Sequence, residues 1–138
     1  MTILVIDGQG GRIGGELVAG AKARFPAAEV LAVGTNSSAA QLMRKAGADL
    51  AASGENAVCV ACRRADYILG PLGIVVADAM LGEITPAMAA AVGSCRAAKI
   101  LLPLNRCELM VAGVARLSIS ALIADALDRL AELAAAGA

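Results

Sequence analysis

Glycines and polar residues crowd one short stretch near the beginning of the chain, directly after an aliphatic run. Six residues of this stretch could contact a ligand: Gly8, Gln9, Gly10, Gly11, Arg12 and Gly14. Glycine tolerates positive φ angles, and its lack of a side chain lets backbone N–H groups approach a phosphate closely. The stretch therefore predicts a loop that binds a phosphate or a nucleotide. The alternative is a plain strand-to-helix turn, in which the glycines serve packing alone.

The spacing of these glycines indicates which kind of nucleotide-binding loop they resemble. The strict dinucleotide pattern is G-x-G-x-x-G, but Ile13 stands where its third glycine would be. The workable register instead has Gly8, Gly11 and Gly14 three residues apart. This register is similar to the loop of some NADPH-dependent reductases, such as dihydrodipicolinate reductase.

A second polar cluster stands where the ribose of a nucleotide would be recognised. Dinucleotide-binding folds place an acid about 20 residues after the glycines, where it holds the ribose 2′-hydroxyl of NAD. This chain has Thr35, Asn36 and Ser37 after the next aliphatic run. Without a carboxylate there, we expect NADP, or the phosphate of a smaller ligand, rather than NAD. These three residues are equally typical of a helix N-terminus that binds no ligand.

Four acidic residues are candidates for a chemical role, and none of them is assigned to catalysis. Asp7 precedes the glycines, where its carboxylate would repel a phosphate. It could hold Mg²⁺ together with Glu55, or accept backbone N–H bonds that shape the turn, and we favour the second role. Asp78 and Glu83 are the other two, and Glu83 is equally well an ordinary loop charge before a helix cap at Thr85. The sequence assigns no metal ligand.

A third polar cluster, Asn105 and Arg106, follows a later aliphatic run. Loops that follow parallel strands meet at one edge of the sheet, where helix N-termini direct their N–H groups. We therefore expect this pair, the glycine stretch and residues 35–37 to surround one ligand. Arg106 is the cation that we most expect to face an anionic group.

The composition excludes several kinds of chemistry. The 138 residues include no His, which removes His-ligated zinc and the usual Ser and Cys catalytic triads. Lys and Arg (12) balance Asp and Glu (12), and Phe25 and Tyr67 are the only aromatic residues. Neither a basic nucleic-acid surface nor a base-stacking platform is therefore expected. No residue stands out as a general acid or base, so whether the protein is an enzyme stays open.

Four cysteines are present, and two of them have a motif spacing. Cys59 and Cys62 form a C-x-x-C pair, typical of a redox site or of half a zinc site. No second such pair supplies further ligands, and the pair falls inside a predicted helix. We therefore favour two buried, unreactive thiols.

The apolar residues are too interrupted for a membrane span. The most hydrophobic uncharged stretches, 67–77 and 84–95, hold eleven and twelve residues, whereas a span needs about 18–20. The chain opens on an aliphatic run without the basic region of a signal peptide, so we expect a cytoplasmic protein. Since 59% of the residues are hydrophobic and a domain of this size keeps much surface, we also expect a homo-oligomer.

Aliphatic runs alternate with helical patterns along the whole chain. Strands are predicted over residues 1–7, 29–34, 49–52, 67–69, 99–104 and 109–113. Helices are predicted over residues 13–25, 39–46, 55–64, 74–80 and 86–92, and from about residue 118 onward. This alternation predicts a single Rossmann-like domain over residues 1–138. We expect a three-layer α/β/α sandwich with a mostly parallel sheet of five to six strands.

Several segments together resemble one family. They are VIDGQGG (5–11), GTNS (34–37), AGA (46–48), GENA (54–57), GPLGI (70–74), MLGEITP (80–86) and LPLNRC (102–107). The family consists of short bacterial proteins, common in anaerobic Firmicutes, that are described as a domain of unknown function. The resemblance covers nearly the whole chain and implies a Rossmann-like cytoplasmic domain, but no activity or ligand. It also implies that Cys107 belongs to a shared motif, whereas Cys59 and Cys62 do not.

Three functions stay open at this point. The first is binding of a small phosphate-containing ligand, such as NADP or another nucleotide, with no nucleic acid or membrane as partner. The second is a non-catalytic sensor or assembly subunit that forms homo-oligomers. The third is a Mg²⁺-dependent enzyme that handles phosphoryl groups with Asp7 and Glu55.

Overall fold

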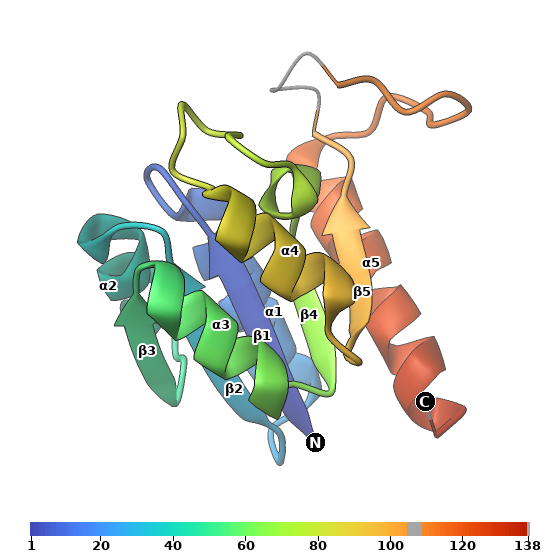
Figure 1. Ribbon diagram of the computed structural model, residues 1–138. Coiled ribbons are helices and arrows are strands. Elements are labelled where there is room, and N and C mark those ends of the chain that lie inside the picture. The colour runs from blue at the N-terminus through green and yellow to red at the C-terminus, as the bar shows by residue number, and fades with distance from the viewer. Residues whose placement is uncertain (105–108, 138) are drawn as a thin grey trace.

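The computed structural model describes residues 1–104 and 109–137 and contains five strands and five α-helices in that part of the chain (Figure 1). The strands are β1 (Thr2–Asp7), β2 (Glu29–Gly34), β3 (Leu50–Ser53), β4 (Tyr67–Pro71) and β5 (Ala98–Leu102). The helices are α1 (Arg12–Arg24), α2 (Ser37–Lys45), α3 (Glu55–Arg64), α4 (Pro86–Ser94) and α5 (Ile119–Ala135). A short 3₁₀ helix, η1 (Leu72–Val75), follows β4.

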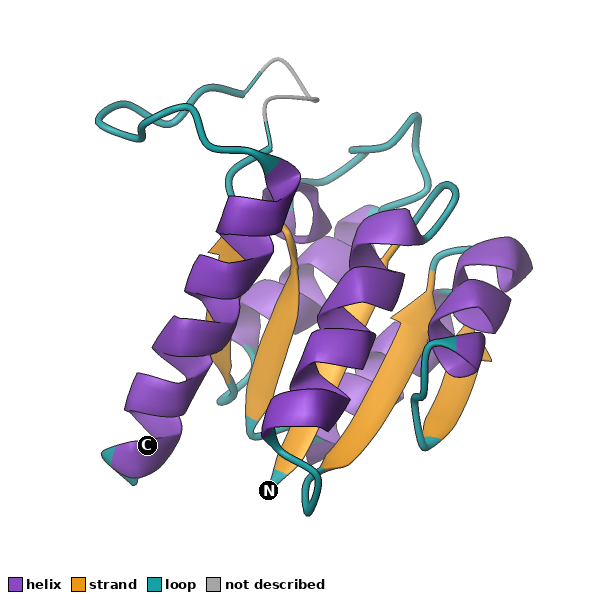
Figure 2. Cartoon of the chain, turned by 180° about the vertical axis from the view of Figure 1, so that it is seen from behind, coloured by secondary structure: helices purple, strands orange, loops and turns teal. Residues whose placement is uncertain are grey.

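The strands form one sheet in the order β3-β2-β1-β4-β5, and every neighbouring pair is parallel. Helices cover both faces, with α3 and α4 in front in Figure 1 and α1, α2 and α5 in front when the molecule is seen from behind in Figure 2. The predicted Rossmann-like α/β/α sandwich is therefore confirmed.

The central strand explains how one short sequence supports two layers of helices. Successive side chains of a strand point to opposite faces of the sheet. Ile3 and Val5 pack with α1, α2 and α5, whereas Leu4 and Ile6 pack with α3, α4 and η1. All four side chains are fully buried. An unbroken aliphatic run is the pattern that a strand covered on both faces requires.

The sixth predicted strand, over residues 109–113, is wrong. Residues 109–118 have no helix or strand, and Gly113 has a φ of 81°. An aliphatic run becomes a strand only where a neighbouring strand supplies hydrogen bonds. Within the described residues, β5 pairs with β4 alone. The segment instead runs outward above the carboxyl edge of the sheet before entering α5 (Figure 1).

The predicted helix over residues 74–80 is also wrong. The helical turn η1 ends at Val75, and the chain then forms a compact loop. Three residues of this loop that are not glycine have left-handed φ angles: Asp78 (67°), Met80 (59°) and Leu81 (56°). Hydrogen bonds from Asp78 N–H to Ile84 O and from Ile84 N–H to Ala79 O close the loop. Short apolar runs do not distinguish a helix from such a loop by composition.

None of the helices in the described ranges combines the length and the apolar character that crossing a bilayer would demand.

Candidate functional site

The direction in which the strands are added reverses between β1 and β4. At such a switch point two loops leave the carboxyl ends of neighbouring strands in opposite directions and open a crevice. A pocket of about 250 Å³ occupies this place. Its lining comprises Asp7, Gly8, Gln9, Ile13, Pro71, Gly73, Met80 and Leu104. Of the predicted glycine stretch, Gly8 and Gln9 border this pocket.

Packing explains three of the glycines in this stretch. A Cβ built on Gly8 would lie 2.6 Å from both the Sδ of Met80 and the Oγ1 of Thr35. Gly11 caps α1 with a φ of 74°, and a Cβ built on it would lie 2.6 Å from the Cα of Ala39 in α2. A Cβ on Gly14 would lie 2.7 Å from the Cβ of Asp7. By contrast, a Cβ on Gly10 would have no atom within 4 Å. Gly11 and Gly14 hold the turn and helices together, whereas Gly10 is not required for packing.

Asp7 has the turn-shaping role that we favoured. Its side chain is only 5% exposed. One carboxylate oxygen accepts the N–H of Gly8 at 2.8 Å, and the other accepts the N–H of Gly14 at 2.7 Å. Because Gly14 lies in the first turn of α1, the positive end of the helix dipole stabilises this buried negative charge.

The loop leaves three backbone donors for a ligand. In the described part of the chain, the N–H groups of Gly10, Arg12 and Ile13 donate to no protein acceptor. Arg12 is well exposed, and its nearest ion-pair contact, from Nε to the Glu16 carboxylate, is 4.0 Å long. The guanidinium of Arg12 therefore remains accessible to an anion.

Glu83 joins the loops that follow β1 and β2. Its Oε1 accepts three hydrogen bonds: from the N–H of Gln9 at 2.8 Å, from the hydroxyl of Thr35 at 2.5 Å and from the amide of Asn36 at 2.9 Å. Burial opposes ionisation of this carboxyl group, but the three hydrogen bonds together outweigh it and hold the pKa of Glu83 below its ordinary value. Glu83 is thus an ionised acceptor at the end of β2.

Sequence reasoning missed this role of Glu83, although it named the residue as a candidate acid. Glu83 is 47 residues from Asn36 and 74 residues from Gln9 in the sequence. No local pattern links positions so far apart. The available signal was indirect: a polar cluster without the expected acid after the second strand leaves donors that another segment can satisfy.

Within the second polar cluster, Asn36 is the helix cap that one of the two interpretations predicted. The side chain of Asn36 accepts the N–H of Ala39 at 2.8 Å and so caps α2, while its amide also donates to the carbonyl of Gln9 at 2.9 Å. Ser37 begins α2 and is exposed. Asn105 and Arg106, the third polar cluster, lie outside the described residues.

Asp7 and Glu55, the two carboxylates that the Mg²⁺ hypothesis uses, have different hydrogen-bond partners in the structure. Glu55 begins α3 and accepts a hydrogen bond from the hydroxyl of Thr85 at 2.6 Å. Asp7 is engaged by backbone N–H groups. Across residues 1–104 and 109–137, no group of three or more His, Cys, Asp or Glu side chains is arranged to hold a metal ion.

The C-x-x-C pair lies inside α3, as predicted. Cys62 is buried and Cys59 is partly buried, and both are free thiols. Burial, with the nearby thiols of Cys95 and Cys59, raises the pKa of Cys62 to about 12. Since the thiolate is the reactive form, Cys62 is inert near neutral pH.

Comparison with known proteins gives one match, to a protein family. No curated protein and no solved structure shows significant similarity to this chain. A family model described as Domain of unknown function (DUF3842) matches residues 2–135. Because this match spans nearly the whole sequence and the same segments form the sheet, its helices and the loops around the pocket, the chain belongs to this family.

Proposed function

We propose that this protein binds a small phosphate-containing ligand in the pocket between the carboxyl ends of β1 and β4. The observation that carries this proposal is the glycine loop itself. It borders the pocket through Gly8, Gln9 and Ile13. In the described part of the chain, it leaves without acceptors the N–H of Ile13 and, next to the pocket lining, those of Gly10 and Arg12. Backbone donors at a helix N-terminus are a favourable environment for phosphate.

The size of the pocket limits the ligand. Ligand sites commonly have volumes of roughly 300–1,000 Å³, and this pocket has about 250 Å³. A phosphate with a small organic group matches that volume better than a whole dinucleotide does. Apolar contacts from Ile13, Pro71, Met80 and Leu104 would accept the organic part.

Glu83 decides which groups can lie at the end of β2. An ionised carboxylate at Thr35 and Asn36 repels a second anionic group. The 2′-phosphate of NADP would occupy this region, so binding of NADP would require the loop that carries Glu83 to move. We therefore place the ligand phosphate at the glycine loop and only uncharged groups toward Glu83.

The first experiment is native mass spectrometry of gently purified protein, which reports subunit number and any retained small molecule together. A retained compound that contains phosphate supports the proposal. Isothermal titration with that compound, or with a panel of mononucleotides and sugar phosphates, then gives the affinity. Absence of binding to every member of the panel, together with absence of any retained phosphate compound, would contradict it.

A matched pair of variants locates the binding site. Gly10→Asp places a negative charge in the loop, and we expect it to weaken binding at least about tenfold. Gly10→Ala adds only a methyl group where no atom lies within 4 Å, and we expect it to bind like the wild type. Equal affinity of all three proteins would show that the loop is structural.

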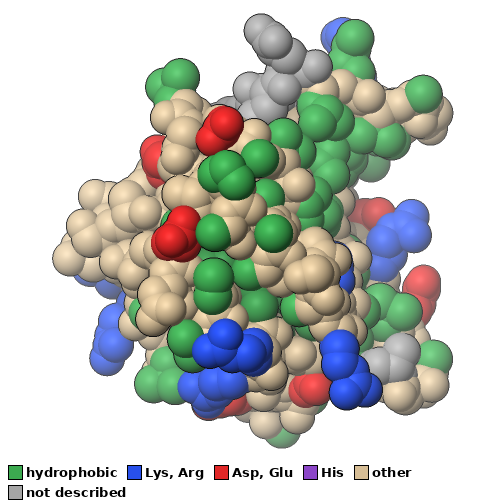
Figure 3. Space-filling model, viewed as in Figure 1, with side chains coloured by type: hydrophobic (Ala, Val, Ile, Leu, Met, Phe, Trp, Pro, Cys, Tyr) green, Lys and Arg blue, Asp and Glu red, His purple; other side chains and the backbone are tan. Residues whose placement is uncertain are grey.

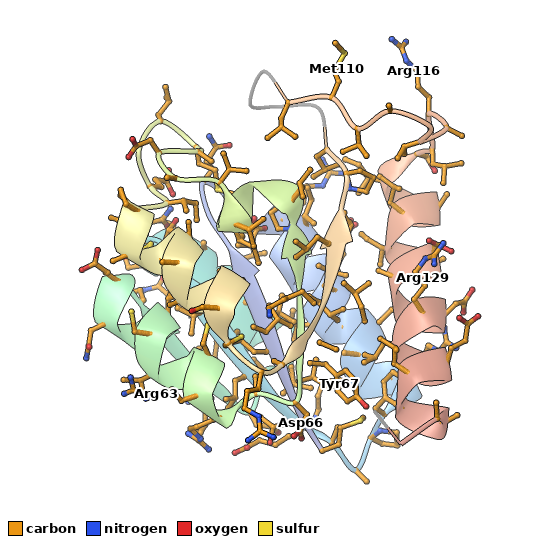
Figure 4. The ribbon with its side chains drawn as sticks, turned by 45° about the vertical axis from the view of Figure 1, so that its right-hand side comes forward. Arg63, Asp66, Tyr67, Met110, Arg116 and Arg129 are labelled. Carbon is orange, nitrogen blue, oxygen red and sulfur yellow. The ribbon has the colours of Figure 1, made fainter. Side chains whose placement is uncertain are left out.

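A second candidate function, an assembly subunit, has an observation of its own. Four large apolar side chains of residues 109–117 are exposed, among them Met110 (86%) and Leu117 (52%). They border a groove of about 410 Å³ that also includes Leu104 and Leu122. Figure 4 shows Met110 and Arg116 on this outlying segment, beyond the carboxyl edge of the sheet. We propose that a second copy of the chain covers this apolar arm, residues 109–117.

A further inference from the structure

A second groove lies at the opposite, amino edge of the sheet, and the glycine loop plays no part in it. It has a volume of about 620 Å³, and its lining includes Arg63, Arg64, Asp66, Tyr67 and Arg96. Figure 4 shows Arg63, Asp66 and Tyr67 at the end of the molecule away from Met110 and Arg116. We infer that this groove, the arginine groove, binds a small organic anion that carries two or more negative charges.

Three guanidinium groups and one carboxylate line the groove, so its charge is positive. Arg64 forms an ion pair with Glu29 at 3.2 Å, and Asp66 accepts the N–H of Thr2 at 2.7 Å. Arg63 and Arg96 form no ion pair with any residue that the structure describes. Basic side chains also gather at this lower end of the face shown in Figure 3. The chain as a whole carries no net charge, so this positive end is a local concentration.

The arginines that line the groove come from two separate elements of the fold. Arg63 and Arg64 occupy the last turn of α3, whereas Arg96 lies in the turn between α4 and β5. A guanidinium is permanently charged and donates two parallel hydrogen bonds to a phosphate or a carboxylate. Donors from two elements that line one groove suit a ligand with two anionic groups. The volume lies within the range of roughly 300–1,000 Å³ that small-molecule sites have.

The walls of the groove favour an organic ion over a simple salt ion. Ala134, which is partly exposed, contributes apolar surface to the groove, and Tyr67 and Ala97 also line it, although they are only 3% and 4% exposed. A compound with a carbon skeleton would bury that surface, whereas a bare inorganic ion would not. The expected ligand is therefore a compact organic polyanion whose charged groups are either phosphates or carboxylates.

A structural role for the arginines is the alternative explanation. Basic residues in the last turn of a helix complement the negative end of its dipole. Arg44 has that position in α2, as Arg63 has in α3, but Arg44 does not line the groove. Arg44→Ala is therefore a matched control, since it removes the same dipole interaction without touching the proposed site.

The test is isothermal titration at low ionic strength, with inorganic pyrophosphate and citrate as probes. We expect at least one probe to bind, and Arg63→Ala and Arg96→Ala each to weaken it about tenfold. We expect Arg44→Ala to bind like the wild type. Preference for pyrophosphate would assign phosphate groups to the natural ligand, and preference for citrate would assign carboxylates. No binding of either probe, or an equal loss in Arg44→Ala, would overturn the inference.

The variant Gly10→Asp separates this site from the glycine loop. Pyrophosphate binding that is lost in Gly10→Asp but kept in Arg96→Ala belongs to the loop, and it would overturn the inference while supporting the proposed function. Binding that is lost in Arg96→Ala but kept in Gly10→Asp supports the arginine groove by itself. Thermal melting of each variant, expected to match the wild type because these side chains are exposed, confirms that the fold is intact.

Discussion

Single residues around the pocket show that the protein itself uses some of the backbone donors of the glycine loop. Asp7 uses the N–H groups of Gly8 and Gly14, and Glu83 uses the N–H of Gln9. A ligand must therefore bind through the donors that remain, and it must tolerate two neighbouring carboxylates. This arrangement favours a ligand with one phosphate at the loop over a ligand with several.

Gly11→Ala will lower the free energy of unfolding by about 2–4 kcal/mol, since an alanine is strained at positive φ and overpacks its neighbours. Its Cβ would lie 2.6 Å from the Cα of Ala39, which forces α1 and α2 apart. Urea denaturation measures the difference. Gly10→Ala should change stability by no more than about 0.5 kcal/mol. Similar losses in both variants would contradict the packing role assigned to Gly11.

Glu83 makes part of the stability dependent on pH. Its pKa is lowered in the folded protein, so the stabilisation is present above the unfolded pKa of about 4.3 and is lost as the pH falls through the lower folded value. Asp49, whose pKa is lowered by hydrogen bonds from the Val30 N–H and from Lys22, contributes in the same direction. The wild type should thus lose stability on acidification below about pH 5.

The variant Glu83→Gln tests this assignment. Glutamine keeps an acceptor oxygen for Gln9, Thr35 and Asn36 but does not titrate. Urea denaturation at a series of pH values should show a shallower acid loss in Glu83→Gln than in the wild type. Parallel curves would mean that folding does not lower the pKa of Glu83.

The elements of the fold follow from side-chain patterns where a buried face exists. The last helix, α5, buries Leu122, Ile123, Ala126, Leu127 and Leu130 and exposes the opposite face. Its N-terminus is capped by Ser118, whose hydroxyl accepts the N–H of Ala121 at 3.1 Å. A helix of this kind is predictable, because one stripe of apolar residues and one cap define both its face and its start.

Leu130→Ala will lower the free energy of unfolding by about 2–5 kcal/mol, because it leaves a cavity in a tightly packed core. Leu130, on α5, is fully buried in the core cluster that α5 forms with α1 and the sheet. Arg129→Ala, next to it on the exposed face, loses only an ion pair with Asp125 and should cost at most about 0.5 kcal/mol. Denaturation curves compare the two. A small loss in Leu130→Ala would mean that α5 does not pack as described.

At the scale of the whole molecule, the two edges of the sheet have different chemical character. The carboxyl edge has the glycine loop, the Glu83 hydrogen bonds and the apolar arm, whereas the amino edge has the arginine groove. All strands run in the same direction, so every strand-to-helix loop lies at one edge and every helix-to-strand loop at the other. The two proposed ligand sites therefore share no lining residue and lie at opposite edges of the sheet.

Association of two chains through the apolar arm can be tested at this scale. Light scattering coupled to size exclusion should give a dimer for the wild type and a monomer for the double variant Met110→Glu, Leu117→Glu. The two new glutamates stand at exposed positions and leave the core unchanged, so the melting temperature of the single subunit should not change. Val60→Glu, an exposed apolar position on α3 away from the arm, is the control and should remain a dimer. A monomeric wild type would refute the proposed assembly.

The sequence by itself determined the layered fold. Aliphatic runs such as residues 2–7 can be buried on both sides only inside a parallel sheet, and the alternation with helices leaves one architecture for them. It also determined the position of the glycine loop and the capping character of Asn36, because both depend on neighbours within a few residues. These features are local, so periodicity and residue type are sufficient evidence for them.

The tertiary structure alone decided the features that depend on distant contacts. The apolar segments 74–80 and 109–113 lack the helix and the strand that their composition suggested, since hydrogen bonds and pairing partners from elsewhere in the chain govern both. Glu83 reaches Thr35 and Asn36 only because the loop after η1 folds over the end of β2. The arginine groove likewise joins α3 with the turn before β5. Each of these contacts joins positions far apart in the sequence, where no periodic pattern connects them.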